Sequence, residues 1–291
     1  MNVRNLVLGT LIGVYVWYVW CWYRLERAPR PRLAARDLAL SFATNFFDAL
    51  GVGNFAPTTA IFKMIRRMPD ENIPGTLNAG YGIPTCIEAL IFIAVVRVDV
   101  DTLVGMIAAS VVGVWLGAGV VARLPRRSVQ LAMGSALLLA AGILLAVNMH
   151  WVPAGGEAVG LSGWKLPFAI AVNFILGGLM SLGIGLYAPC LILVSLLGMS
   201  PLVAFPIMMG SCAFLLAFGG VRFIRSGRYD YQAALGLAIG GIPGVLVAIY
   251  LVKSLPLQWL RWLVLVAVVY AAGMLLASAR KVAPEPTTPA T

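Results

Sequence analysis

Residues 50–57 read LGVGNFAP, and residues 182–189 repeat this phrase as LGIGLYAP. The leucine, both glycines, the alanine and the proline are identical in the two copies. Glycine and proline interrupt helices, yet each copy lies inside an apolar stretch. A helix break at membrane depth is tolerated only where protein or a water-filled cavity satisfies the backbone. The repeated phrase therefore indicates two turns buried at a common site.

The composition is that of an integral membrane protein. Of the 291 residues, 61% are hydrophobic and only 11% are charged, and the mean hydropathy is +0.93. Soluble domains carry about 25% charged residues. Four of the apolar runs that reach the roughly 20 residues needed to cross a bilayer are 103–122, 129–147, 231–252 and 259–279. The sequence predicts an all-α polytopic membrane protein.

The remaining bulk features exclude other classes. A net charge of +10 does not indicate nucleic-acid binding, because the basic residues form short clusters between apolar runs, as cytoplasmic membrane loops do. The four cysteines lie in apolar segments and are interpreted as buried hydrophobes. Residues 1–24 lack a signal-peptidase site, which predicts a retained transmembrane helix. The Pro- and Thr-rich residues 282–291 are predicted to be a disordered tail.

Further residues of the first half match residues of the second half, in the same order and at nearly the same offset as the two phrases. These matches predict two internal repeats after the first helix, at 37–147 and 165–279. If residues 42–65 cross the membrane completely, 12 of the 21 lysines and arginines lie in the cytoplasm and 9 lie outside. If 42–65 and 169–197 are re-entrant hairpins, 16 of the 21 lie in the cytoplasm. The positive-inside rule favours the hairpins.

Each repeat then contains one broken-helix hairpin and three transmembrane helices. Because that number of crossings is odd, the second repeat is inverted relative to the first. The prediction for residues 1–291 is a single membrane transport domain in the bacterial inner membrane, with its N-terminus outside and its C-terminus in the cytoplasm. The hairpin arms reach about half of the bilayer, so both apexes are expected at the midplane.

The apexes predict an anion site. Pro57 and Pro189 suit the first turn of a helix, and half-helices are expected to begin at Thr58 and Cys190. Two helix N-termini aimed at one cavity favour a small anion. The alternative is that the glycines only allow close packing. The predicted substrate-binding residues are Gly51, Gly53, Asn54, Phe55, Ala56, Pro57, Thr58, Asn78, Gly183, Gly185, Tyr187, Ala188, Pro189, Cys190 and Ser211.

Two acidic residues are candidates for ion coupling, because ionisable side chains are costly inside a membrane. Asp48 lies three residues before Gly51, and Glu88 lies in the following apolar run. The alternative reading of each is a neutral or hydrogen-bonded packing residue. Thr76, Tyr81 and Cys212 are further hydrogen-bond donors at comparable places in the two repeats. No metal site and no cofactor are predicted.

The paired glycine phrases, with LLGMSPLVAFPIMMGSC at residues 196–212, resemble the TauE/SafE or sulfite exporter family over residues 38–279. Leu197, Gly198 and Pro201 match its Leu-Gly-x-x-Pro motif, whereas residues 206–208 replace a common Gly-Thr-Ser. The resemblance implies ion-driven export of sulfite, sulfoacetate or another organosulfonate, and the departure allows a different substrate. A Walker A motif would indicate transport driven by ATP, and the sequence contains none.

Other functions stay open at this point. An enzyme is not expected, since the single histidine lies in a predicted loop and no HExxH motif occurs. A helper protein for membrane assembly and a channel-like anion conductor are alternatives to a transporter. The expected partners are a small anionic substrate and the lipid bilayer. The small residues of 113–119 could pack helices within one chain or between two, which leaves a homodimer open.

Overall fold

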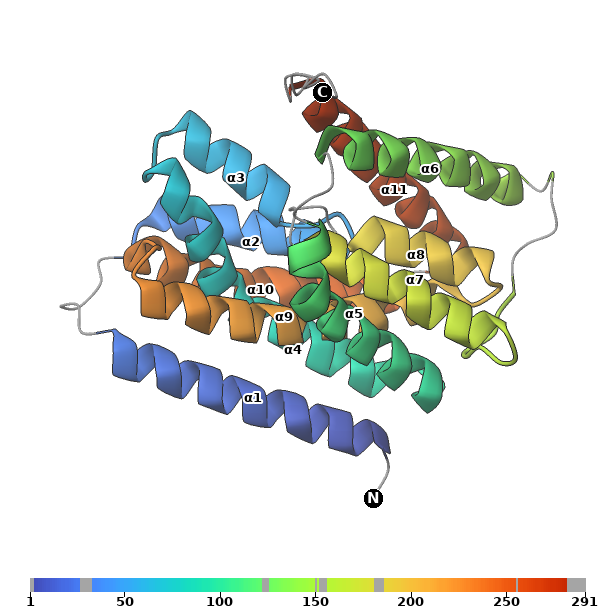
Figure 1. Cartoon of the computed structure of the whole chain (residues 1–291), viewed down its shortest axis with the longest axis horizontal. Coiled ribbons are helices and arrows are strands. Elements are labelled where there is room, and N and C mark those ends of the chain that lie inside the picture. Colours follow the sequence, from blue (N-terminus) through green and yellow to red (C-terminus); the bar gives the residue numbers. More distant parts are fainter. Residues whose placement is uncertain are drawn as a thin grey trace, which may run out of the picture.

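The computed structural model describes residues 3–26, 33–121, 126–149, 151, 156–180, 186–254 and 256–281 (Figure 1). The first half contains α1 (Val3–Leu25), α2 (Ala35–Ala49), α3 (Phe55–Met64), η1 (Asp70–Asn72), α4 (Ile73–Val95), α5 (Val100–Val121) and α6 (Arg126–Asn148). The second half contains α7 (Lys165–Met180), α8 (Tyr187–Leu196), η2 (Pro201–Val203), α9 (Ala204–Ser226), α10 (Tyr231–Ser254) and α11 (Leu257–Lys281). The predicted tail at 282–291, Gly183 and Gly185 lie outside the described residues.

The helices confirm the predicted all-α polytopic membrane protein. Five segments of the described chain are long and apolar enough to cross a membrane. They are Val3–Leu25, Asp70–Val95, Pro201–Ser226, Tyr231–Leu251 and Trp262–Arg280. Helices α5 and α6 are also long, with 22 and 23 residues. In contrast, α3 and α8 contain only 10 residues each and reach about 15 Å, half of the hydrocarbon core.

The ends of each short-helix pair lie together, so each pair forms a hairpin. Arg67 follows α3, and its guanidinium forms an ion pair of 2.9 Å with Asp37 in the first turn of α2. Lys165 begins α7 and donates a hydrogen bond of 3.0 Å to the carbonyl oxygen of Leu197, directly after α8. Both α2–α3 and α7–α8 therefore return to the side from which they start.

The two hairpins start from opposite ends of α4, which is about 35 Å long. At its N-terminal end, the Thr76 hydroxyl accepts a hydrogen bond from the backbone of Asp230, and Asp230 also pairs with Arg67 of the first hairpin. Beyond its C-terminal end, the backbone N–H of Asp99 donates a hydrogen bond to Val159 in the loop that leads to α7. The same loop accepts a hydrogen bond from the backbone N–H of Ser200, which follows α8. The predicted inversion requires this arrangement.

The first helix of each hairpin packs on a helix of the other half, and these contacts join the two halves. Helix α2 packs on α10 of the second half, and α7 packs on α5 of the first half. The Ser41 hydroxyl donates to the carbonyl oxygen of Leu237 at 2.5 Å, and the Asn173 amide donates to that of Met106 at 2.6 Å. Ser41 and Asn173 align with each other when the two phrases are aligned, so corresponding side chains form corresponding bonds. Helices α4 and α9, and α6 and α11, also pack on each other.

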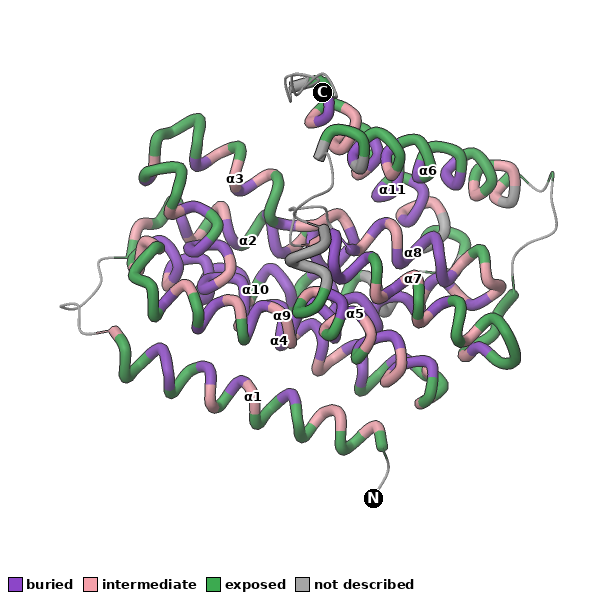
Figure 2. Tube along the Cα trace, in the orientation of Figure 1, coloured by how far each residue is buried: buried purple, intermediate pink, exposed green. Residues whose placement is uncertain are grey.

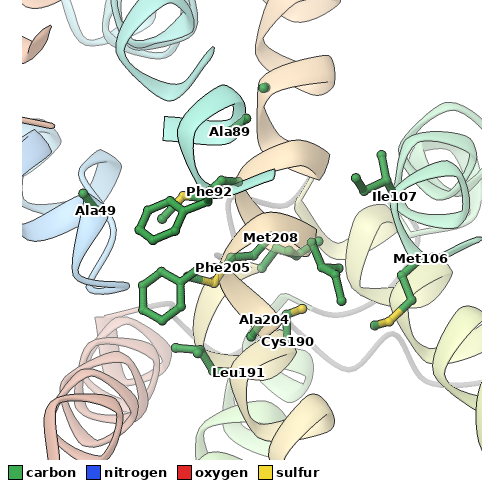
Figure 3. Close-up of a cluster of buried hydrophobic side chains, with 14 of the residues drawn as sticks. Ala49, Ala89, Phe92, Met106, Ile107, Cys190, Leu191, Ala204, Phe205 and Met208 are labelled. Carbon is green, nitrogen blue, oxygen red and sulfur yellow. The ribbon is translucent and has the colours of Figure 1, made fainter. Parts of the chain in front are cut away.

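The core lies between α4 and α9, where the rings of Phe92 and Phe205 are 5.0 Å apart (Figure 3). Helix α1 runs along this pair at one edge of the molecule (Figure 1). Its Tyr18 hydroxyl donates to the carbonyl oxygen of Ala79 in α4, and its Tyr15 hydroxyl donates to that of Ala213 in α9. Helix α1 therefore contacts both halves and holds them together by these hydrogen bonds.

The short arms of the two hairpins have different surroundings. Helix α8 buries six of its ten residues and contacts α6, α9 and α11. Helix α3 buries only Thr58 and Phe62, and Figure 2 shows most of its trace as exposed or intermediate. The rest of the chain therefore covers α8 much more than α3, although the two phrases that precede these helices share five of their eight residues.

Candidate functional site

A buried polar cluster lies where the first hairpin turns. The Asn54 amide donates hydrogen bonds to a carboxylate oxygen of Asp48 at 2.9 Å and to the amide oxygen of Asn45 at 3.1 Å. The Tyr187 hydroxyl of the second hairpin approaches the same oxygen of Asp48 at 3.5 Å. Asp48 is 1% exposed. The cluster thus joins residues from both hairpins around one carboxyl group.

The backbone of the first apex explains why the phrase contains two glycines. Gly51 and Gly53 have φ angles of +89° and +90°, a region that residues with a side chain rarely adopt. A Cβ atom on Gly51 would lie 3.2 Å from Leu191 of α8 and 3.7 Å from Met208 of α9, so the turn fits directly against the second half. Leu191 and Met208 are drawn in Figure 3. Gly183 and Gly185 lie outside the described residues.

Both short helices begin without a side-chain cap. Asn54 is the N-cap residue of α3, but its side chain binds Asp48 instead of the helix backbone. Leu186 is the N-cap residue of α8 and has no group that could cap. The first amide groups of a helix that lack such partners carry partial positive charge. Two uncapped N-termini therefore lie next to the Asp48 cluster.

The starts of these helices differ from the prediction. Helix α3 begins at Phe55 and α8 begins at Tyr187, three residues before Thr58 and Cys190. Pro57 and Pro189 lie within the first turn, as expected for these prolines, and only the first residue of each helix is earlier than predicted. Proline is compatible with this position, because the amide groups of the first turn have no acceptor within the helix.

A chain of hydroxyl groups holds α3 against α2 and α4. The Tyr81 hydroxyl lies 2.5 Å from that of Thr58 and 2.9 Å from that of Thr44. Tyr81 is fully buried, and its ring centroid lies 5.8 Å from that of Phe55. This chain fixes the N-terminal turn of α3, which has few other contacts.

Glu88 and Cys212 complete the surroundings of Asp48. Glu88 is fully buried on α4, and neither of its carboxyl oxygens has a hydrogen-bond partner among the described residues. Its carboxyl group is close enough to Asp48 for direct electrostatic interaction, and Tyr187 and Cys212 interact with both acids. Cys190 of α8 interacts with Cys212. The site therefore contains two acids, and no lysine, arginine or histidine is buried among the described residues.

The other predicted residues lie at varying distances from this cluster. Ala56 is exposed, Pro57 and Pro189 are half-buried, and Ala188 is buried in α8. Ser211 is buried beside Cys212, and its hydroxyl has no partner among the described residues. Asn78 donates to the carbonyl oxygen of Pro74 in its own helix and lies against Gly219, so it packs α4 on α9.

Sequence reasoning missed Asn45 as a member of the cluster. Asn45 lies three residues before Asp48 and thus on the same helix face, which was a usable signal. Sequence reasoning also did not anticipate an apolar groove of about 420 Å³ between α2 and α10. This groove is lined by Leu38, Phe42, Ile239, Pro243 and small neighbours, and it lacks the polar groups that an anion needs.

One of three comparisons with known proteins finds a match. The chain matches the family model described as Sulfite exporter TauE/SafE over residues 2–145 and 166–291, which is nearly its whole length. No curated protein and no solved structure shows a significant match to the chain.

Proposed function

Because the chain belongs to the sulfite exporter TauE/SafE family, we propose that it is a secondary transporter that exports sulfite, sulfoacetate or another small organosulfonate. The observation that carries this proposal is the meeting of two hairpins from opposite ends of the bundle. The first apex lies against α8 and α9, and Tyr187 of the second hairpin reaches Asp48 of the first. An anion bound there would contact both halves of the protein.

The chemistry of binding follows from the uncapped helix starts. The N-terminal amides of α3 and α8 supply donors and partial positive charge to an oxyanion. The Tyr187 and Thr58 hydroxyls would supply further donors by turning to the anion from Asp48 and Tyr81, their partners here. The thiols of Cys190 and Cys212 offer a soft, weakly polar wall. The substrate-binding residues are those of the two phrases, with Ser211 nearby. Asp48 and Glu88 are the groups proposed to couple substrate to an ion.

The experiment that tests this function is uptake by purified protein in liposomes. The panel contains sulfite, sulfoacetate, sulfate, a carboxylate and zwitterionic taurine, each with and without a pH gradient. We expect saturable uptake of at least one sulfur oxyanion and none of taurine. Uptake that stays linear with concentration would indicate a channel-like conductor. Folded protein that moves no solute would contradict transport and favour a helper role.

The Tyr187 hydroxyl gives a local test of the site. In Tyr187→Phe the anion loses one donor, and hydrogen bonds to charged groups contribute about 1.5–3 kcal/mol, so uptake at low substrate should fall roughly tenfold or more. The matched control is Tyr23→Phe, because Tyr23 is 82% exposed on α1. Equal uptake by the two variants would remove Tyr187 from the site.

Orientation in the bacterial inner membrane is part of the proposal. The basic residues favour a cytoplasmic position for the ends of the first hairpin and for the C-terminus. In a variant without its four native cysteines, Glu71→Cys and Glu157→Cys place single thiols at exposed positions at opposite ends of α4. We expect an impermeant maleimide to label position 157 from outside cells and position 71 only after lysis. The reverse pattern would invert the proposed orientation.

A further inference from the structure

The two buried acids carry an inference about the coupled ion that rests on the proposed anion transport. Asp48 is 1% exposed, Glu88 is fully buried, and their carboxyl groups interact. Asp48 accepts bonds from Asn54 and Tyr187, whereas no other group of the described residues donates a hydrogen bond to Glu88, so a proton between the two carboxyl groups is the bond left open to Glu88. Two adjacent carboxylates without a basic partner are costly inside a protein, and a shared proton relieves that cost.

None of the side chains that face this pair supplies the positive charge that a proton would bring. Tyr81 faces it from α4, Tyr187 from α8 and Cys212 from α9, and Cys190 lies beside Cys212. All four are neutral acids that cannot supply positive charge. The described part of the chain contains no group of three or more His, Cys, Asp or Glu residues that could hold a metal ion. A proton neutralises one of the two charges without needing ligands of its own.

The acids are not needed to build the fold, because they occur in one half only. When the two repeats are aligned on their glycine phrases, Asp48 falls on Met180 and Glu88 falls on Gly220, so neither position of the second half is acidic. The corresponding hairpin contacts, Ser41 with Leu237 and Asn173 with Met106, form in both halves without such acids. One acid pair serves a site to which both halves contribute.

The location of Asp48 connects its charge to the substrate. Asp48 binds Asn54, which precedes α3, and approaches Tyr187, which begins α8. An anion held by these two helix starts lies next to the carboxyl group. Two negative charges about 5 Å apart weaken binding on the order of a hundredfold at an effective dielectric constant of 20. Anion binding and protonation of the pair therefore favour each other, and this coupling is reciprocal.

We infer that one proton, shared by Asp48 and Glu88, binds together with the anion and crosses the membrane in the same direction. The consequence is proton–anion symport rather than exchange of an anion for a proton. A dianion then moves with a net charge of −1, so an inside-negative membrane potential favours its export. A monoanion moves without net charge, so the membrane potential does not drive it, and its export follows the anion gradient against any inward proton gradient.

The test uses sulfoacetate with the full chain in liposomes that contain the pH indicator pyranine, with the membrane potential clamped by potassium and valinomycin. Sulfoacetate entry is expected to acidify the lumen, and replacing sodium by choline should not alter the ratio of protons to anions. In Glu88→Gln this ratio should fall at least fivefold. The matched control is Glu71→Gln, since Glu71 is exposed outside the cluster, and its ratio should equal that of the wild type.

The outcomes separate this inference from the proposed function. Sulfoacetate uptake by the wild type with an alkaline or unchanged lumen overturns the symport inference and leaves transport intact. No uptake of sulfoacetate or of any other anion in the panel overturns transport, and symport with it. The wild-type ratio decides between symport and exchange even if Glu88→Gln does not fold, and an unchanged ratio in folded Glu88→Gln would remove the proton from this pair.

Discussion

Gly51→Leu is expected to abolish anion uptake while the protein still reaches the membrane. The leucine must adopt a φ near +89°, which costs about 1–2 kcal/mol. Its side chain must also displace Leu191 and Met208, and overpacking of this kind costs about 1–3 kcal/mol. Because these neighbours belong to the second half, the strain separates the two apexes. The measurement is sulfoacetate uptake in liposomes, normalised to protein of native elution volume.

Two controls separate the causes. Gly53→Ala imposes the same positive φ, but no atom lies within 4 Å of its new Cβ, so it reports backbone strain alone and should retain partial uptake. Gly13→Leu adds the same side chain to α1, where nothing lies within 4 Å of the new Cβ, and uptake should match the wild type. Wild-type uptake by Gly51→Leu would show that the apexes need not meet.

Arg67→Ala should be the most destabilising single change at the ends of the first hairpin. The Arg67 guanidinium is 11% exposed and binds Asp37 at 2.9 Å and Asp230 at 3.2 Å. Its removal leaves the 1%-exposed carboxyl group of Asp37 without this partner, and breaking a buried pair costs about 3–5 kcal/mol. The measurement is thermal unfolding in detergent, where a large fall in Tm is expected.

The control is a double-mutant cycle with Asp37→Asn, in which Arg67→Ala should cost much less because no charge is left buried. Hydrogen bonding to Asp37 raises the pKa of Arg67 above its already high ordinary value. A raised pKa in the folded state adds stability that is present below the unfolded pKa and is lost only above it. The loss of stability caused by Arg67→Ala should therefore be constant between pH 7 and 10. In the double-mutant cycle, an equal loss of stability with Asp37 and with Asn at position 37 would contradict the ion-pair account.

The sequence predicted those features that follow from local pattern. Two glycine phrases in apolar surroundings indicated the helix breaks, and the structure has short helices at both, with Gly51 and Gly53 at positive φ. The distribution of basic residues favoured a hairpin, and Arg67 does return to Asp37. Asp48 and Glu88 were selected for their cost inside a membrane, and both are buried together.

The features that could not be predicted depend on pairing between distant helices. Ser41 belongs to the first half, but its partner Leu237 belongs to the second, and no local signal indicates this exchange. The different burial of α3 and α8 arises because α6 and α11 contact α8, although the two phrases share five of their eight residues. The helices begin at Phe55 and Tyr187, three residues before the predicted starts, because proline is compatible with the first turn and so does not mark the helix boundary.

The most direct test of the central claim asks whether the anion binds at the start of α3. In a variant without native cysteines, Ala56→Cys places a thiol in the first turn of α3, and Lys63→Cys places one in the last turn, and both positions are exposed. Sulfoacetate should slow alkylation at position 56 in a saturable way and leave position 63 unaffected. Equal alkylation rates at position 56 with and without saturating anion, in protein that transports it, would contradict binding at the paired apexes.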